Sequence, residues 1–178
     1  MAVDHDAWVE EIVVPEDVRQ QEPVSVRVRV FSRSAGRARI ELKIAGATLG
    51  SRAVNLLPGE NRFLFPTRFA RHGAVNLVAR VSAQDDQVAR NDELTEIVWV
   101  GPRAKILYVE GSPENSSHLA DALTRQGLDV EVADVGRLAG EPGLLARKDG
   151  VILSDIRAQS IDTATGERLE AYVRDRGG

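Results

Sequence analysis

The sequence predicts an all-β sandwich followed by a three-layer α/β unit with a parallel sheet. Three observations predict this order. Apolar residues alternate with polar ones up to about residue 100, they recur at helical spacing further on, and Gly101-Pro102-Arg103 separates the two patterns. We therefore expect a sandwich at residues 1–100, a linker at 101–103 and an α/β unit at 104–178.

The composition excludes several functional classes. The 178-residue chain has no cysteine, which excludes disulfide scaffolds, cysteine zinc sites and a thiol nucleophile. Its net charge of −4 argues against nucleic-acid binding, which needs a positive surface to displace counterions. No apolar run approaches the roughly 20 residues that span a bilayer, so we expect no direct membrane insertion in this segment.

Period-two alternation marks seven short segments before the linker. Residues 24–30 and 38–44 each alternate apolar with polar or charged side chains, and Ser34-Ala35-Gly36 between them predicts a turn. We expect these two runs to form one hairpin with an apolar and a charged face. The other strands are expected at residues 8–14, 48–56, 62–69, 75–82 and 94–100. Seven short strands without helical spacing are typical of an antiparallel immunoglobulin-like sandwich.

Side-chain parity predicts which residues of these strands are buried. Trp8 and Trp99 lie within apolar patterns, so we expect both in the core. Pro66, within the segment at 62–69, indicates an edge strand or a bulge. Five basic residues are expected on the outer face of this hairpin: Arg27, Arg29, Arg37, Arg39 and Lys43. They form either an ordinary solvated sheet surface or a binding surface for an acidic partner.

Short apolar runs and helical spacing alternate after the linker. Strands are expected at residues 105–109, 129–132 and 150–154, the first of them central. A helix with Leu119 and Leu123 on its apolar face ends at Gly127, and a last helix presents Leu169 and Tyr172. Short strand–helix–strand connections imply parallel pairing. Doubly wound sheets usually have about five strands or more, so we expect an incomplete unit whose unpaired edge can pair with another copy of the chain.

The candidate site lies at the carboxyl end of these parallel strands, where open α/β sheets bind ligands. The residues expected there are Glu110, Gly111, Ser112, Asn115, Ser116 and Asp155, joined by Asp134. Three interpretations remain open. Backbone amides at the helix start hold an anion, the three carboxylates hold Mg²⁺, or the polar residues cap the helix and the carboxylates are solvated. His118 lacks the Gly-x-Ser-x-Gly context of a serine hydrolase, and we assign no catalytic residue, no metal and no cofactor.

Two parts of the chain resemble known families. Residues 105–113, Lys-Ile-Leu-Tyr-Val-Glu-Gly-Ser-Pro, together with 148–155 and 169–178, resemble the first part of class I glutamine amidotransferase-like domains, which have a flavodoxin-like sheet. Residues 84–93 resemble the acidic, asparagine-containing hairpin of immunoglobulin-like modules of the CARDB type. In large bacterial membrane proteins such modules precede amidotransferase-like domains, often beside von Willebrand A-type modules. The resemblance implies a soluble, extracytoplasmic segment of a membrane-anchored protein.

The chain departs from these families at the residues that carry chemistry. Amidotransferases use a cysteine on a sharp turn with a downstream histidine and glutamate, and this chain has no cysteine. The Asp-x-Ser-x-Ser metal motif of von Willebrand A domains is also missing. We therefore expect a non-catalytic structural or interaction segment, whose partners are another protein, other domains of the parent chain or a second copy. Two alternatives stay open: a fragment of an amidotransferase-like hydrolase or transferase, and a sensor of a small ligand or anion.

Overall fold

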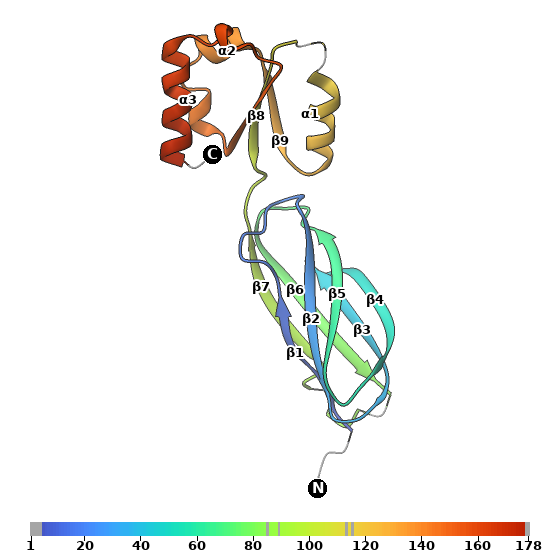
Figure 1. Ribbon diagram of the computed structural model, residues 1–178. Coiled ribbons are helices and arrows are strands. Elements are labelled where there is room, and N and C mark those ends of the chain that lie inside the picture. Colours follow the sequence, from blue (N-terminus) through green and yellow to red (C-terminus); the bar gives the residue numbers. More distant parts are fainter. Residues whose placement is uncertain (1–4, 85, 89, 113, 115, 177–178) are drawn as a thin grey trace. The chain divides into compact units, whose positions relative to one another are not determined.

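The computed structural model describes residues 5–84, 86–88, 90–112, 114 and 116–176. The chain divides into two compact units, Met1–Pro102 and Arg103–Gly178 (Figure 1). We refer to them as the sandwich and the α/β unit.

The sandwich consists of two antiparallel sheets. Its strands are β1 (Ala7–Val13), β2 (Pro23–Ser32), β3 (Gly36–Ile44), β4 (Ala47–Leu56), β5 (Gly59–Arg68), β6 (Gly73–Ala83) and β7 (Glu93–Val100). One sheet has the order β1-β2-β5 and the other the order β4-β3-β6-β7. Seven strands in this three-plus-four arrangement form an immunoglobulin-like sandwich, as the sequence predicts.

The predicted hairpin of residues 24–30 and 38–44 is wrong. β2 pairs with β1 and β5, whereas β3 pairs with β4 and β6. The two runs therefore belong to opposite sheets, and their apolar faces meet across the core. Alternation determines which face of a strand is buried but not which strand lies beside it.

The basic stripe expected on that hairpin is consequently divided between two outer faces. Arg29 on β2 forms ion pairs with Glu10 and Glu11 of the neighbouring β1, at 3.6 and 2.9 Å. Lys43 on β3 lies 3.8 Å from Glu41 of its own strand. Exposed pairs of this kind are typical of a solvated sheet surface. The residues therefore do not make one continuous basic surface.

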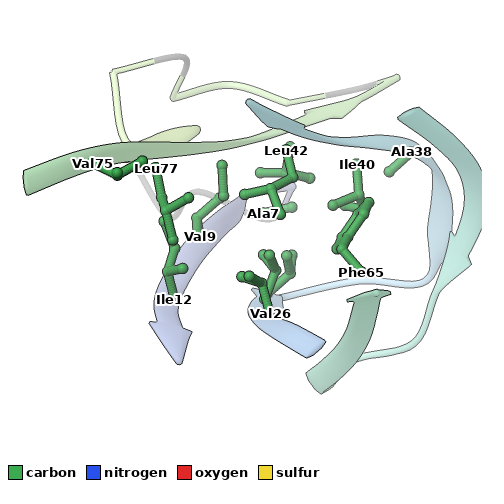
Figure 2. Packing of buried hydrophobic residues seen from close by; sticks show 14 of the residues in the cluster. Ala7, Val9, Ile12, Val26, Ala38, Ile40, Leu42, Phe65, Val75 and Leu77 are labelled. Atoms are coloured by element: carbon green, nitrogen blue, oxygen red, sulfur yellow. The ribbon is translucent and has the colours of Figure 1, made fainter. Parts of the chain in front are cut away.

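The core of the sandwich lies between the inner faces of both sheets (Figure 2). Val26 and Val28 from one sheet and Ile40 and Leu42 from the other are fully buried. Phe65 on β5 is 2% exposed, and a Cβ at Gly50 of β4 would lie 3.2 Å from its ring. β5 pairs only with β2 within the described residues, which agrees with the edge position that Pro66 predicts. Large side chains from both sheets thus fill one continuous core.

The two tryptophans differ from the expectation that both are core residues. Trp8 stacks on Phe31 with ring centroids 4.7 Å apart, and it is partly buried. Trp99 is 73% exposed. In the second half of β7 the residues on both faces of the strand are apolar. The structure buries Val98 and Val100 more than Ile97 and Trp99. Alternation could not choose between these two faces.

Three carboxylates meet at one end of the sandwich. Asp86 accepts hydrogen bonds from the backbone of Ala7 and Val88, and Asp6 accepts one from the Asn91 amide at 3.0 Å. Asp92 is 6% exposed, and its Oδ1 has no hydrogen-bond partner within the described residues. Burial, and then the charge and hydrogen bond of Asp86, raise the pKa of Asp92 to about 6.

The Asp92→Asn variant is expected to change how the stability of the sandwich depends on pH. Because the pKa of Asp92 is higher in the folded than in the unfolded state, the protonated side chain stabilises the fold. This contribution is complete at a pH below the ordinary pKa of 3.8 and is lost as the pH rises through about 6. The side-chain amide of the introduced asparagine is neutral at every pH, and it can still donate a hydrogen bond to Asp86. Variant and wild type should therefore match near pH 4, and the variant should be more stable at pH 7. Urea unfolding followed by tryptophan fluorescence measures this, with the exposed Asp17→Asn as control; equal pH profiles for Asp92→Asn and wild type would contradict the assignment.

The α/β unit is built on a three-stranded parallel sheet. Its elements are β8 (Lys105–Glu110), α1 (Ser116–Arg125), β9 (Asp129–Ala133), α2 (Val135–Gly140), η2 (Leu145–Arg147), β10 (Gly150–Ser154), η3 (Ala158–Ser160) and α3 (Thr163–Arg176). The strand order is β10-β8-β9, and both pairings are parallel. The predicted parallel pairing around a central first strand is confirmed.

Helices lie on both sides of this sheet (Figure 1). Leu107 and Val109 of β8 pack with Leu138 of α2 and Tyr172 of α3 in a second hydrophobic cluster. The other face of the sheet is on the side of α1, which ends at Arg125 (Figure 1). Gly127, two residues further on, has a φ of +98°, which agrees with its predicted position as a C-terminal cap. Within the described residues, no helix combines the length and the apolar character that a membrane span requires.

Candidate functional site

Glu110, the last residue of β8, lies at the centre of a buried hydrogen-bond network. It is 3% exposed. The Tyr108 hydroxyl donates to its Oε2, and the Ser112 backbone amide donates to its Oε1 at 3.2 Å. A side-chain hydrogen bond also joins it to Ser154, its register partner on β10. The hydrogen bond from Tyr108 and then that from Ser154 hold the pKa of Glu110 below its usual value, so Glu110 is an ionised, well-partnered carboxylate.

Gly111 is the point where the loops after β8 and β10 touch. Its backbone amide donates to the Ser154 carbonyl at 2.9 Å. A Cβ at this position would lie 1.9 Å from the Asp155 carbonyl oxygen, a distance that no side chain tolerates. The glycine, one of the residues expected at the candidate site, therefore permits close approach of another part of this chain.

The structure brings four of the six candidate residues together. Ser112 Oγ lies 3.3 Å from Asp155 Oδ2, next to Glu110 and Gly111. Ser116 is the first residue of α1. Asn115 lies outside the described residues. The carboxyl-end rule for parallel sheets thus located a real cluster of polar side chains.

The carboxylates do not form the Mg²⁺ site considered above. Asp134 instead caps the start of α2, where its Oδ1 accepts a hydrogen bond from the Arg137 backbone amide at 2.7 Å. Within the described residues, no three histidine, aspartate or glutamate side chains are grouped so that they could hold a metal ion. What the cluster offers instead is a polar, hydrogen-bonded junction between two loops.

Sequence reasoning missed Tyr108 and Ser154. Both are strand residues, and an alternating pattern predicts which strand positions are buried but not which polar groups pair there. Tyr108 and Glu110 are two residues apart, so they share one face of β8. A tyrosine and a glutamate at i and i+2 at the end of a buried strand would have been the signal.

The Tyr108→Phe variant is expected to have a less stable α/β unit at neutral pH. The stability of this unit should also depend less on pH in the acidic range than it does in the wild type. Glu110 has a lowered folded-state pKa, so its contribution is present above the ordinary value of 4.5 and is lost as pH falls through the folded-state pKa. Removing its main donor raises that pKa. Variant and wild type should therefore converge at low pH, which urea unfolding followed by helical circular dichroism at several pH values measures.

Tyr172→Phe provides a matched control in the same unit. The Tyr172 hydroxyl donates to the uncharged backbone carbonyl of Lys148 at 3.2 Å. Its loss should cost about 1 kcal/mol at every pH. If both variants lost the same stability at pH 7 and at pH 3, the assignment of Tyr108 as the donor that sets the Glu110 pKa would be wrong.

Comparisons with known proteins concern about half of the chain. No protein-family model and no curated protein matches it. Among solved structures, the CARDB domain of a Pyrococcus furiosus protein, determined in complex with di-metal ions, is 21% identical over 54% of this chain and 88% of its own, with a TM-score of 0.49. A domain of a candidate cell surface protein from Methanosarcina acetivorans is 16% identical over 56% of this chain and 93% of its own, with a TM-score of 0.44. A β-glucosidase from Listeria innocua is 15% identical over 55% of this chain but only 16% of its own, with a TM-score of 0.41.

Proposed function

We propose that this chain is a non-catalytic structural and interaction segment of a larger bacterial membrane-associated protein. In this proposal a CARDB-type immunoglobulin-like sandwich acts as spacer and docking surface, and it precedes an amidotransferase-like α/β unit on the extracytoplasmic side. The partner is another protein, another domain of the parent chain or a second copy. The observation that carries the interaction role is the pair of outer strands in the small parallel sheet.

Both outer strands offer an unpaired side. Within the described residues β9 and β10 each pair only with β8. Apolar side chains lie exposed on these strands and on the helix beside them: Val132 on β9 is 38% exposed, Leu153 on β10 is 45% exposed and Val173 on α3 is 57% exposed. Unpaired strand edges with exposed apolar residues are templates for pairing with another chain. This combination supports a docking role.

The polar cluster at the carboxyl end supports the non-catalytic part of the proposal. Glu110 is engaged by Tyr108, Ser154 and the backbone of Ser112, and Gly111 is in contact with the Asp155 backbone. A general acid or base needs a pKa near the working pH and access to substrate. A buried glutamate with a lowered pKa has neither property.

Self-association tests the docking role. Sedimentation equilibrium of the full chain should show a dimer that depends on concentration, and Leu153→Lys should shift it towards monomer because a charge on an edge strand opposes pairing. Leu57→Lys is the matched control, since Leu57 is 66% exposed and lies in the sandwich. A wild type that stays monomeric, or equal effects of both variants, would contradict pairing through this edge.

A ligand sensor is the second candidate, because Ser112 and Asp155 present polar side chains at the end of a parallel sheet. A ligand that binds only the folded state raises the melting temperature. We expect neither phosphate nor Mg²⁺ at millimolar concentration to raise the melting temperature of the α/β unit. A rise that disappears in Asp155→Ala would favour the sensor over the structural segment.

A further inference from the structure

The sandwich has a hollowed surface that the proposed function does not use. A hollow of about 700 Å³ lies between the β3–β4 turn, the start of β4, the end of β5, the loop that follows it and the start of β6. A second, shallower hollow of about 620 Å³ lies beside it, against the start of β2 and Pro66. The two share Leu49, Thr67 and Arg68, so they form one continuous groove, which we call the sandwich groove.

A β-bulge places an apolar side chain in this groove. In the pairing of β3 with β4, Leu42 is opposite Gly50 and Lys43 is opposite Thr48, which leaves Leu49 as the extra residue. Bulges redirect a side chain out of the regular pattern of the sheet. Leu49 lines both hollows and is 38% exposed. It is therefore an apolar contact point in the middle of the sandwich groove.

The lining of the groove carries positive charge. Arg68 and Arg71 supply this charge, His72 lines the groove beside them, and no carboxylate is among the described residues that line either hollow. Arg68 donates to the Gln21 carbonyl, whereas Arg71 and His72 lie exposed in the loop between β5 and β6. Glu41 accepts a hydrogen bond from the Thr48 hydroxyl at 2.8 Å, and it lies 3.8 Å from Lys43 Nζ, which offsets its charge. The sandwich groove is thus complementary to an acidic ligand.

The groove also runs between two edge strands. Within the described residues β4 pairs only with β3, and β5 pairs only with β2. Each edge presents backbone groups to which an extended chain can hydrogen-bond. An open groove between two strand edges suits an extended peptide better than a compact small molecule, which prefers an enclosed pocket.

We propose that the sandwich groove binds an extended acidic peptide segment of a partner protein, with one apolar side chain of that peptide against Leu49. The carboxylates of the peptide contact Arg71 and His72. This binding is independent of the edges of the parallel sheet, because every residue of the groove belongs to the sandwich.

Fluorescence anisotropy of the full chain tests this proposal. The probes are fluorescein-labelled synthetic peptides that have a central leucine flanked by glutamate and aspartate, and matched peptides that have lysine at the acidic positions. The acidic peptide should bind saturably and more weakly as salt is added, since salt screens exposed charges. The lysine peptide should not bind. Absence of saturable binding by the acidic peptide, or equal binding of both peptides, would overturn the proposal.

Three variants and a competitor locate the binding. Arg71→Glu should weaken binding about tenfold, equivalent to roughly 1.4 kcal/mol, and Leu49→Ala should weaken it severalfold. Arg27→Glu is the matched charge reversal, at an exposed position outside the groove, and should bind like wild type. Thermal melting confirms that each variant is folded. Equal loss in Arg71→Glu and Arg27→Glu, or complete displacement of the peptide by inorganic phosphate, would show a general charge effect or a small-anion site and overturn the proposal.

Discussion

Replacement of Gly111 by alanine should strongly destabilise the α/β unit and leave the sandwich unchanged. The added Cβ would lie 1.9 Å from the carbonyl oxygen and 2.8 Å from the carbonyl carbon of Asp155. Both are backbone atoms, so the contact is relieved only if the loops after β8 and β10 separate. That separation breaks the 2.9 Å hydrogen bond between Gly111 and Ser154. Overpacking lowers the free energy of unfolding by about 1–3 kcal/mol, and a clash with backbone atoms at this distance should reach or exceed the upper end of that range.

The two units can be followed separately in this experiment. Both tryptophans lie in the sandwich, and the three α-helices of the described part of the chain lie in the α/β unit. Urea unfolding should therefore show a lower midpoint for Gly111→Ala in helical circular dichroism but not in tryptophan fluorescence. Gly166→Ala is the matched control in α3, where a Cβ meets no atom within 4 Å. It should stabilise the unit by up to about 1 kcal/mol, since alanine is the better helix former; a similar loss for both variants would contradict the close contact at Gly111.

Replacement of Phe65 by alanine should destabilise the sandwich by about 3–5 kcal/mol. Phe65 is 2% exposed, its ring is in contact with the position of Gly50, and the Arg52 guanidinium lies 4.9 Å from the ring centroid. Alanine would leave a cavity between the two sheets, and Gly50 has no side chain that could fill it. The rigid backbone of two paired strands limits how far the site can collapse.

Leu64→Ala is the control for Phe65→Ala. Leu64 is the preceding residue of β5, points to the other face and is 52% exposed. Its truncation should change stability by no more than about 0.5 kcal/mol. Urea unfolding followed by tryptophan fluorescence gives both values. Comparable losses for the two variants would mean that β5 does not close the core in the described register.

The strands could be predicted where only one face of a segment is apolar. In β2 and β3 the apolar parity is unambiguous, and Val26, Val28, Ile40 and Leu42 are all buried as expected. In the second half of β7 both faces are apolar, and for that reason the prediction that Trp99 is a core residue is wrong. The pairing of β2 with β3 was predicted from a turn signal alone. That signal was insufficient, because a short connection also serves a chain that crosses between sheets.

The position of the candidate site could be predicted from the sequence, but the contacts between its residues could not. Strand order around β8 follows from short strand–helix–strand connections, and it brings Glu110, Ser112 and Asp155 to one end of the sheet. Whether these groups face a ligand or each other depends on distances of a few ångströms between loops. At Gly111 the neighbour is the backbone of Asp155, whose carbonyl oxygen lies 1.9 Å from the position of a Cβ.

The seven sandwich strands, the three parallel strands, the helices α1 and α3 and the division near residue 102 could all be predicted from the sequence, because period and turn residues act locally, whereas α2 was not predicted. The tertiary structure alone decided which strands are neighbours, which face of β7 is buried and what Gly111 contacts. Backbone hydrogen bonds between strands are the same for any side chains, so the choice of neighbour depends on how all the apolar faces are buried together. That is a property of the whole fold, and no single segment carries it.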